Sequence, residues 1–367
     1  MDSSTTPRVA IVGGGLGGLL CARVLQLHGR PVTVFEGEPS PEARGQGGTL
    51  DMHPETGQVA LRAAGLLEKF QALSRPEGQE WRLLDHVTGA VLSGEIPDGG
   101  DEERPEIDRG RLRGLLLGSL RPGTVHWGHS VGGVTPHPDG TCQVRFREGG
   151  SEHFDLVIGA DGAWSRVRPG VSDAVPAYTG VTFVETGLDD VDTRHPALAG
   201  LTGEGTMMAK APGRGLFVQR NSGGHIRVYA ALRVPEDWYV AGRLDFADTE
   251  AVRADLLARY TGWDPALLGF LRGNDSGFVN RPLHALPAPH SWDHVPGVTL
   301  LGDAAHLMPP LGVGANLAML DGAELAQALI AEPTVDDAVR AYESVMLPRA
   351  GELAKATAEG LGHLLPG

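Results

Sequence analysis

Glycines with the spacing of a phosphate-binding turn occur near the start of the chain. Gly13, Gly15 and Gly18 follow the apolar run Val9–Val12 and lead into a helix-forming segment. In such a turn the first glycine permits a tight bend, the second lets the backbone approach a pyrophosphate, and the third lets helix and strand pack closely. Glu36 follows at roughly the 20-residue separation at which an acidic side chain reaches the ribose of an adenosine. These residues predict a dinucleotide site.

A second group of candidate residues follows the apolar run Val298–Leu301. Asp303 stands at the expected end of that strand, where a carboxylate can accept hydrogen bonds from a ribityl chain. The proline- and glycine-rich stretch beyond it opens a helix, whose first N–H groups would support negative charge on the pyrimidine edge of a flavin. This motif therefore favours FAD over NAD. The cofactor contacts expected in it are Asp303, Pro310, Gly312, Gly314 and Asn316.

A third motif joins a buried strand to an acidic turn. The apolar run that ends at Ile158 leads through a glycine and an alanine to Asp161 and Gly162. Ligands of parallel sheets are contacted from the carboxyl ends of the strands. Asp161 is therefore expected to reach the same crevice as the other two motifs.

The three motifs require a parallel sheet whose strands end at one edge. The opening segment fits this requirement, because Arg8–Val12 indicates a buried strand, Leu16–His28 a helix and Pro31–Glu36 a second strand. The middle of the chain changes to alternating, turn-broken segments that are typical of an antiparallel sheet. Further helices are expected at Pro54–Leu73, Arg109–Leu120, Thr249–Tyr260, Gly314–Ala331 and Val335–Ala358, and further strands at Val125–Trp127, Cys142–Arg147, Asp155–Ile158, Gly215–Gln219, His225–Leu232 and Val298–Leu301.

This order predicts an α/β protein. We expect a Rossmann-like FAD-binding domain with a parallel sheet, an inserted antiparallel-sheet substrate domain and a long C-terminal helix. A length of 367 residues agrees with more than one folding unit. The FAD-binding domain is expected in residues 1–75, 105–168 and 278–334, the substrate-binding domain in 76–104 and 169–277, and the C-terminal helix in 335–367.

The composition argues against several kinds of partner. The chain has 31 Lys and Arg against 46 Asp and Glu, a net charge of -15, and no dense basic cluster, so neither nucleic acid nor an anionic membrane is expected to bind. The apolar stretch after Arg8 is interrupted by glycines, and no other segment approaches the roughly 20 apolar residues that span a bilayer. Cys21 and Cys142 form no disulfide framework. We expect a cytoplasmic protein.

With these motifs in order, the chain resembles the flavoprotein monooxygenases of the para-hydroxybenzoate hydroxylase type over nearly all of its length. The stretches Arg44–His53, Pro105–Arg113 and Gly302–Pro310 are especially similar to the tetracycline-inactivating branch of that family. By this resemblance FAD is contacted by Glu36, Asp51, Arg109 and Asp303, flavin and pyridine nucleotide by Asp161, and NADPH by Arg44.

The resemblance also implies the reaction. A member of this family takes electrons from NADPH or NADH and, through a flavin C4a-hydroperoxide formed with dioxygen, hydroxylates an aromatic or polyketide-type small molecule, tetracycline-like compounds included. The cofactor performs the difficult chemistry, so positioning residues are expected rather than a catalytic acid or base. The flavin is expected to be bound non-covalently, because neither cysteine lies where its ring could be tethered.

The substrate side departs from the family. Val313 stands where the flavin loop commonly has a polar residue, so one flavin contact would come from backbone alone. Where tetracycline-inactivating relatives present polar groups, approximate alignment places residues of other types, namely Glu185, Thr206 and Arg227. An apolar face suits a flat ring. The expected substrate contacts are Glu185, Met208, Phe217 and Arg227, and the identity of the substrate stays open.

Parts of the sequence also match other functions. Gly128–Gly132 matches the motif of a serine hydrolase with Ser130 as nucleophile, but prolines follow too soon for the helix that such an elbow requires. A flavin halogenase would share the cofactor domain, yet no paired-tryptophan motif surrounds Trp238. A reductase, or a protein that keeps FAD without turnover, stays open.

Five histidines are candidates for a metal site or for contacts near the flavin. No metal site is expected, because prolines separate the three that are grouped and indicate an irregular loop. Two others stand beside flavin motifs, where they could orient a loop or touch substrate. The first three are His284, His290 and His294, and the last two are His53 and His306.

Overall fold

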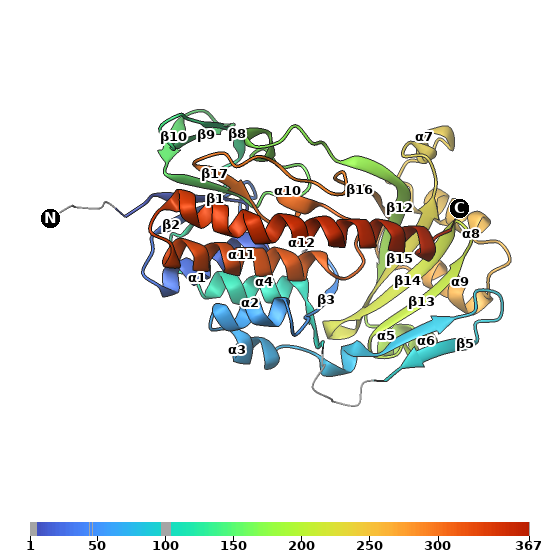
Figure 1. Ribbon diagram of the computed structural model, residues 1–367. Coiled ribbons are helices and arrows are strands. Elements are labelled where there is room, and N and C mark those ends of the chain that lie inside the picture. The colour runs from blue at the N-terminus through green and yellow to red at the C-terminus, as the bar shows by residue number, and fades with distance from the viewer. Residues whose placement is uncertain (1–5, 44, 46, 97–103, 367) are drawn as a thin grey trace.

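The computed structural model describes residues 6–43, 45, 47–96 and 104–366. Its first layer is a five-stranded parallel sheet in the order β17-β11-β1-β2-β7 (Figure 1). The apolar residues of β1 are buried on both faces, as is typical of parallel strands. β1, β11 and β17 are parallel neighbours, and each is followed by one of the three sequence motifs. The three motifs therefore lie side by side at the carboxyl edge of the sheet. The strands are β1 Val9–Val12, β2 Val32–Glu36, β7 Val125–Trp127, β11 Leu156–Gly159 and β17 Val298–Leu300.

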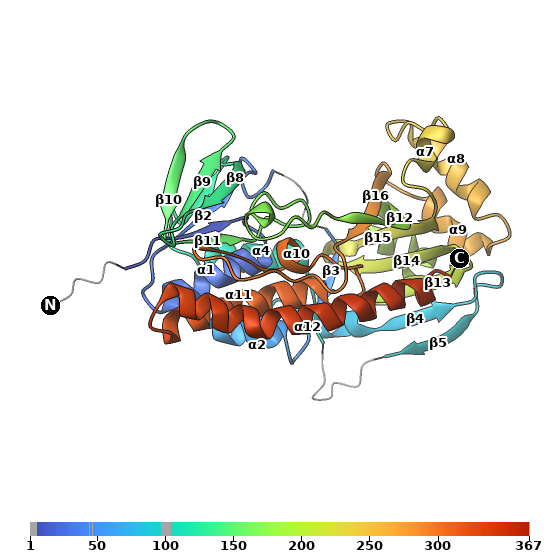
Figure 2. The same cartoon turned by 45° about the horizontal axis from the view of Figure 1, so that its top comes forward.

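Helices cover one face of this sheet, and the three-stranded sheet β8–β10 lies on the other (Figures 1 and 2). α1 and α11 approach closely through glycine, because a Cβ on Gly17 would lie 2.4 Å from the Ala318 carbonyl oxygen, and one on Gly322 would lie 2.4 Å from that of Gly17. Small residues therefore set the distance between these two helices. The elements are α1 Leu16–Leu27, α2 Gly57–Ala63, α3 Leu67–Gln71, α4 Arg109–Gly118, α11 Gly314–Ala331, β8 Val131–Pro136, β9 Cys142–Phe146 and β10 Ser151–Phe154.

A seven-stranded sheet in the order β16-β12-β15-β14-β13-β4-β5 forms the second part of the molecule. Its strands are antiparallel except for β4 and β13, which pair in parallel, so the sheet is not antiparallel throughout. One face packs against α5, α6, α8 and α9 around a buried apolar core. The elements are β4 Trp81–Leu84, β5 Val91–Glu95, β12 Ala177–Leu188, β13 Thr206–Ala211, β14 Arg214–Asn221, β15 His225–Arg233, β16 Val279–Ala285, α5 Val191–Arg194, α6 Pro196–Thr202, α7 Trp238–Ala241, α8 Thr249–Arg259 and α9 Pro265–Arg272.

The last helix, α12 Val335–Leu364, runs along both sheets (Figures 1 and 2). Over the parallel sheet, the Tyr342 hydroxyl donates a hydrogen bond to the Leu300 carbonyl oxygen at 3.0 Å. At its other end, Leu361 and the following Leu365 are buried in a small apolar cluster on the seven-stranded sheet. One helix therefore connects the two sheets.

Some observed elements differ from the expected ones. The helix expected over Pro54–Leu73 is broken at Gly65, whose φ of +65° ends α2 before α3 begins. A short pair, β3 Thr49–Asp51 and β6 Glu106–Asp108, joins two segments that no local pattern connects. The expected boundary before residue 278 places β16 with the FAD-binding part, but β16 pairs with β12 and is part of the seven-stranded sheet.

Candidate functional site

A cleft of about 2220 Å³ lies between the carboxyl edge of the parallel sheet and the seven-stranded sheet. Small-molecule pockets usually measure roughly 300–1,000 Å³, so this cleft has room for a large cofactor together with a second molecule. Both groups of predicted residues line it. They are Gly13, Gly15, Gly18, Glu36, Asp51, Arg109, Asp161, Asp303, Pro310, Gly312 and Gly314 on one side, and Glu185, Thr206, Met208, Phe217 and Arg227 on the other.

The glycine turn forms one end of the cleft, at the N-terminus of α1. Gly13 has a φ of +109°, and a Cβ there would lie 2.3 Å from the Ala160 carbonyl oxygen. A Cβ on Gly18 would lie 2.4 Å from the Gly13 carbonyl oxygen. Around Gly15, by contrast, a Cβ would meet only the Ala160 carbonyl oxygen, at 3.9 Å, because Gly15 faces the cleft. Among the described residues no side chain caps α1, which leaves its positive end to an anion.

Two side chains hold this turn in place. Glu36 ends β2 and accepts a hydrogen bond from the Gly14 backbone N–H at 2.7 Å. Arg113 of α4 is almost fully buried and donates to the carbonyl oxygens of Gly14 at 3.0 Å and Pro41 at 3.1 Å, and to Glu38 at 3.1 Å. Arg113 escaped prediction because a buried guanidinium that binds carbonyl oxygens has no sequence signature.

Asp161 shapes the turn that follows β11. Its carboxylate accepts hydrogen bonds from the Ser165 hydroxyl and the Arg166 backbone N–H, both at 2.6 Å. Burial raises the pKa of Asp161, although these hydrogen bonds oppose the rise. Arg168 connects this turn to that of Asp303, because its guanidinium donates to the carbonyl oxygens of Ala163 at 2.8 Å in the first turn and of Asp303 at 3.1 Å and Ala304 at 2.7 Å in the second. The two acidic motifs are thus fixed relative to each other.

A buried ion network lies behind the Asp303 turn. The Asp321 carboxylate of α11 accepts hydrogen bonds from the Gly302 backbone N–H at 3.0 Å, from His306 at 2.6 Å and from Arg349 of α12 at 3.0 Å. Burial alone would lower the pKa of His306, but the Asp321 carboxylate raises it, which favours the imidazolium form. Among its two expected roles, His306 therefore fits the orientation of a loop.

Asn316, near the start of α11, connects the proline- and glycine-rich loop to the segment of Asp51 and His53 through hydrogen bonds, the one to the Gly312 carbonyl oxygen being 3.4 Å long. Its side-chain amide donates to the Asp51 carbonyl oxygen at 2.8 Å, and its side-chain oxygen accepts from the His53 backbone N–H at 3.0 Å. Asn316 is buried and is not among the described residues that line the cleft. A contact of its side chain with FAD therefore stays a prediction. His53 lies 2.8 Å from the Asp51 carboxylate and orients it toward the cleft.

The β3–β6 pair brings a further acid to the cleft. Arg109 begins α4 directly after β6 and lines the cleft with Asp51 and Glu106. Glu106 was not expected as a site residue, yet it is buried and lies 3.8 Å from Arg75. Burial, reinforced by the Asp51 carboxylate, raises the pKa of Glu106 to about 7. Arg44, which is expected to meet NADPH, lies outside the described residues.

The groups at this side of the cleft fit FAD. The uncapped end of α1 and the open side of Gly15 suit a pyrophosphate, and Glu36 lines the same end, where an adenosine ribose would be held. The Asp303 carboxylate is exposed to the cleft, and the described residues provide no hydrogen-bond donor for it, so it is available to a ribityl hydroxyl. The start of α11 is also uncapped by any described side chain, as expected for the helix that would face a flavin.

The opposite wall of the cleft combines aromatic and charged side chains. Phe183 of β12 and Phe217 of β14 lie with their ring centroids 5.8 Å apart, and Met208 of β13 pairs with Phe217. Phe183 was missed, although the alternation along β12 places it on the same face as Glu185. Beside these apolar groups the wall carries an ion cluster of three cleft-lining residues, Glu185, Arg227 and Arg281.

Comparison with known proteins identifies the family. Residues 6–357 match the family model described as FAD binding domain. The monooxygenase penA of Penicillium thymicola is 31% identical to the chain, over 97% of this chain and 95% of the relative. The chain belongs to this family of FAD-dependent monooxygenases. The flavin monooxygenase fold expected from the motifs is thereby confirmed, and FAD is its cofactor.

Solved structures of other proteins share this monooxygenase fold. HpxO of Klebsiella pneumoniae, complexed with FAD and uric acid, superposes with a TM-score of 0.83 at 22% identity, covering 98% of this chain and 89% of that one. The tetracycline destructase Tet(55) superposes with a TM-score of 0.74 at 20% identity, covering 98% of this chain and 90% of that one. At such identities the likeness concerns the fold alone.

The serine-hydrolase alternative loses its structural basis. Ser130 is followed at once by β8, a strand, whereas a nucleophile elbow must lead into a helix. Trp238, around which a flavin halogenase would have its paired-tryptophan motif, is buried in the core of the seven-stranded sheet. It is not among the described residues that line the cleft.

The three grouped histidines have separate partners. His284 lies 2.9 Å from Glu236, and His290 lies 2.9 Å from the Ser172 hydroxyl. His294 stands between two carboxylates of α12, those of Glu343 at 3.0 Å and Asp336 at 2.7 Å. His290 and His294 therefore have local structural roles, whereas His284 also lines the cleft.

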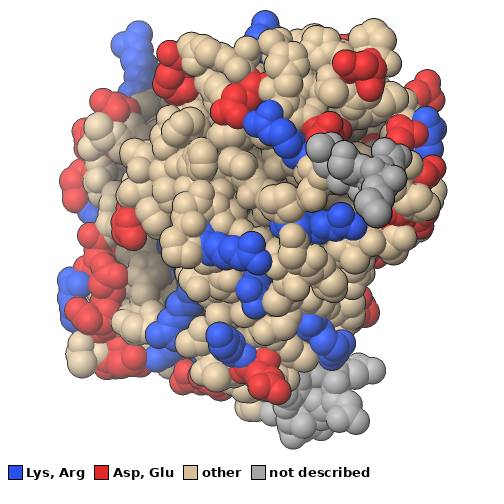
Figure 3. All heavy atoms as spheres, turned by 90° about the vertical axis from the view of Figure 1, so that its left-hand side faces the viewer, with Lys and Arg blue, Asp and Glu red and all other residues tan. Residues whose placement is uncertain are grey.

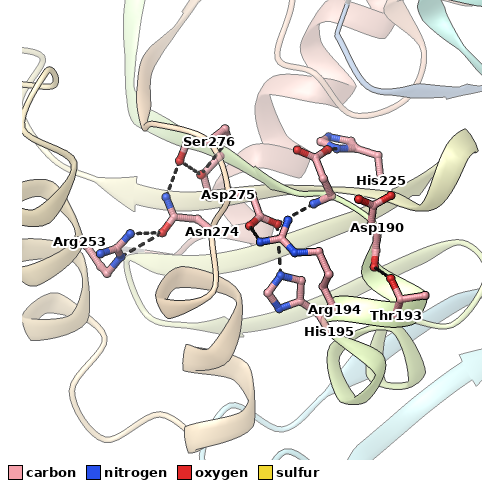
Figure 4. A network of polar contacts seen from close by, with 11 residues as sticks. Asp190, Thr193, Arg194, His195, His225, Arg253, Asn274, Asp275 and Ser276 are labelled. Carbon is pink, nitrogen blue, oxygen red and sulfur yellow. Dashed lines mark hydrogen bonds and ion pairs between the residues drawn. The ribbon is translucent and has the colours of Figure 1, made fainter.

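A polar network outside the cleft contains two more histidines (Figure 4). Asp275 accepts hydrogen bonds from the Asp189 backbone N–H at 2.9 Å and from His195 at 3.2 Å, and it also pairs with Arg194. His225 lies 2.7 Å from the Asp189 carboxylate. These contacts fix the turn that follows β12 and give this network a structural role.

The surface carries charges of both signs. On the face at the parallel-sheet end, basic and acidic side chains are spread among uncharged residues (Figure 3). Across the described part of the chain, no helix combines the length and the apolar character that a membrane span requires.

Proposed function

We propose that this protein is an NAD(P)H- and oxygen-consuming monooxygenase that hydroxylates an aromatic or polyketide-type small molecule. The observation that carries this proposal is a single cleft lined by the dinucleotide turn, the Asp303 turn and an aromatic wall with an ion cluster. Its volume of about 2220 Å³ accommodates the cofactor and a substrate together. Transfer of an oxygen atom requires both to be bound at the same time.

The residues of the chain are proposed to bind and orient rather than to react. When bound, FAD supplies the redox chemistry. Each turnover consumes one NADPH or NADH, one dioxygen and one proton, and it forms one hydroxylated product and one water. The positive end of α1 binds the pyrophosphate, and Glu36 orients the ribose. Asp303 holds the ribityl chain, and Arg109 and Asp51 border the same side. Asp161 and Arg44 stay our proposed contacts for the pyridine nucleotide.

The proposed substrates are planar. Phe183, Phe217 and Met208 offer an extended apolar surface, which suits stacking with a flat ring. Two proteins that share the fold act on or bind compounds with fused rings, since one holds uric acid and another is a tetracycline destructase. A tetracycline is therefore one member of the proposed substrate class and not its defining member.

The proposal is tested on the full chain. The purified protein should be yellow, should bleach when mixed anaerobically with NADPH or NADH, and should recover its colour in air. A screen of aromatic polyketides, tetracyclines and simple phenols with mass detection should show one product heavier by one oxygen atom. A protein that never retains flavin, or whose flavin neither pyridine nucleotide reduces, would contradict the proposal.

A further inference from the structure

Two carboxylates face each other across the β3–β6 pair. Asp51 of β3 is the direct cross-strand partner of Glu106 of β6, and both residues line the cleft. Side chains that stand directly opposite in an antiparallel pair lie on one face, with their Cβ atoms roughly 4.5–5.5 Å apart. Two negative charges at this separation repel each other, so a proton held on one of the carboxylates stabilises the pair.

The arginine beside Glu106 does not satisfy its carboxylate. Arg75 pairs with Glu106 through two backbone hydrogen bonds, of 2.7 and 3.2 Å. Its guanidinium, however, donates to the Arg220 carbonyl oxygen at 2.8 Å and to the Thr49 hydroxyl at 3.3 Å. It lies 3.8 Å from the Glu106 Oε2 atom, which is too far for a hydrogen bond. That oxygen is buried and has no hydrogen-bond partner among the described residues, so it is available to carry a proton.

Glu106 can exchange a proton near neutral pH. Burial raises the pKa of Glu106 to about 7, and the Asp51 and Asp108 carboxylates reinforce this rise, whereas Thr49 and Arg75 oppose it. Charged side chains also come from the other elements around the β3–β6 pair, namely Arg109 of α4, which lines the cleft, Glu77 and Glu80 at the short helix η1 Pro76–Gln79, and Arg220 of β14. Of these, Glu77 is exposed to solvent, and Glu80 and Arg220 form their own ion pairs.

A histidine connects the carboxylate pair to solvent. The His53 ring lies 2.8 Å from the Asp51 carboxylate through Nε2 and 3.7 Å from the Glu55 carboxylate through Nδ1. His53 is buried, whereas the Glu55 side chain is 61% exposed and has Arg104 at 3.8 Å. An imidazole with a carboxylate near each nitrogen can accept a proton on one side and release it on the other. His53 therefore offers a route between the surface and the pair.

The pair stands next to the start of α11. Gly312 belongs to the loop before this helix, and a Cβ there would lie 3.8 Å from an Asp51 carboxylate oxygen. The Asn316 side-chain amide also donates to the Asp51 carbonyl oxygen at 2.8 Å. The first N–H groups of α11 are those that would support negative charge on a flavin. A carboxyl group that can take up a proton therefore lies beside the place where the flavin would gain charge.

We propose that Asp51 and Glu106 form a carboxylate pair that takes up one proton from solvent when bound FAD is reduced and returns it when the flavin is reoxidised. A hydride from NADPH or NADH brings two electrons and one proton to FAD, so the flavin gains one negative charge and NADP⁺ or NAD⁺ leaves. The second proton forms an O–H bond on Glu106 and offsets that charge. The inference rests on the proposed function and adds to it how the protein compensates the charge of the reduced cofactor.

The midpoint potential of the bound flavin counts the protons that accompany reduction. It is measured on the FAD-loaded full chain with a chemical reductant and reference dyes, without pyridine nucleotide, oxygen or substrate. Each proton taken up with two electrons lowers the potential by about 30 mV for each tenfold decrease in proton concentration. Just above the pKa of Glu106 we expect a slope of about 45–60 mV per pH unit, because between one and a half and two protons should be taken up there.

Two variants assign the second proton. Glu106→Gln should reduce the slope to about 30 mV per pH unit, because glutamine resembles the protonated acid and cannot exchange a proton. Its potential should match that of the parent protein below the pKa of Glu106 and exceed it at higher pH, whereas a merely structural role would shift the potential equally at every pH. The matched control Glu95→Gln removes an exposed cleft-lining carboxylate and should keep the slope of the parent protein.

Infrared spectroscopy of the parent protein gives a second readout and keeps the test informative if Glu106→Gln fails to fold. About one pH unit above the pKa of Glu106, the reduced-minus-oxidised spectrum should show the carbonyl stretch of a newly protonated carboxyl group, which shifts in D₂O. Absence of this band, or equal slopes in Glu106→Gln and the parent protein, would overturn the proton uptake. Since neither measurement needs turnover, both can fail while NADPH consumption and hydroxylation succeed, and the reverse is also true.

Discussion

Gly15 differs from the neighbouring glycines in what surrounds it. A Cβ on Gly13 or Gly18 would collide with backbone within 2.4 Å, whereas one on Gly15 would enter the cleft. We therefore expect Gly15→Val to fold with nearly unchanged thermal stability but to bind FAD at least about tenfold more weakly, a loss of about 1.4 kcal/mol. Gly13→Ala should instead lower stability itself. Flavin absorbance of the purified proteins and their thermal unfolding would distinguish the two, and equal stability losses would contradict this division.

Glu106 makes stability depend on pH. Burial raises its pKa from 4.5 to about 7, so the unfolded chain releases this proton first as the pH rises. The contribution of Glu106 is greatest below pH 4.5 and is lost as the pH rises to about 7, by on the order of 3 kcal/mol. Glu106→Gln should therefore flatten the pH dependence of the free energy of unfolding over this interval. Urea titrations at several pH values test this.

An exposed carboxylate at the rim of the same cleft provides the control. Glu95→Gln changes the charge by the same amount, but Glu95 is exposed, so the pH dependence should stay close to that of the parent protein. If Glu106→Gln has the same slope as the parent protein between pH 4.5 and 7, Glu106 ionises normally and this assignment fails.

At the scale of elements, the sequence predicts the features that depend on residues close together in the chain. The glycine turn, β1, α1 and the start of α12 at Val335 follow from spacing within a few residues, and all occur as expected. The pairing of β3 with β6 and the place of β16 beside β12 depend on residues far apart in the chain, which no periodicity records. The same reason explains Arg113 and Arg168, whose partners include carbonyl oxygens of turns that are distant in the chain.

The buried network behind Asp303 gives an element-scale prediction. Asp321→Asn should lower the free energy of unfolding by about 3–5 kcal/mol, because it leaves the buried His306, and the partly buried Arg349, without a full counter-charge. Glu324→Gln is the matched control, since Glu324 pairs with the same Arg349 but is 28% exposed, and its loss should cost less than about 1 kcal/mol. Urea unfolding measures both. If both variants lose a similar free energy of unfolding, Asp321 contributes mainly through Arg349 and not through the Asp303 turn.

At the scale of the whole molecule, α12 and the residue that follows it are attached to both sheets. Tyr342 fixes it to the parallel sheet, and Arg233 of β15 donates two hydrogen bonds to the Leu365 carbonyl oxygen, at 2.9 and 2.7 Å. Leu364 lines the cleft between these two attachments. The helix therefore fixes the position of the substrate wall relative to the cofactor side of the cleft. A cleft that binds two molecules together requires such a fixed arrangement.

This role predicts how the protein unfolds when the attachment is cut. In the full chain, release of FAD and the change in tryptophan fluorescence should coincide during urea unfolding, because α12 joins the parallel sheet to the seven-stranded sheet, whose core holds Trp238 and Trp263, two of the six tryptophans. Removing residues 361–367 takes away the buried Leu361 and Leu365, so the part of the fluorescence change that comes from Trp238 and Trp263 should move to lower urea and separate from FAD release. Arg233→Gln, which removes only the two hydrogen bonds, should shift it less. Coincident transitions in the truncated protein would show that the sheets are coupled mainly through the cleft walls and not through α12.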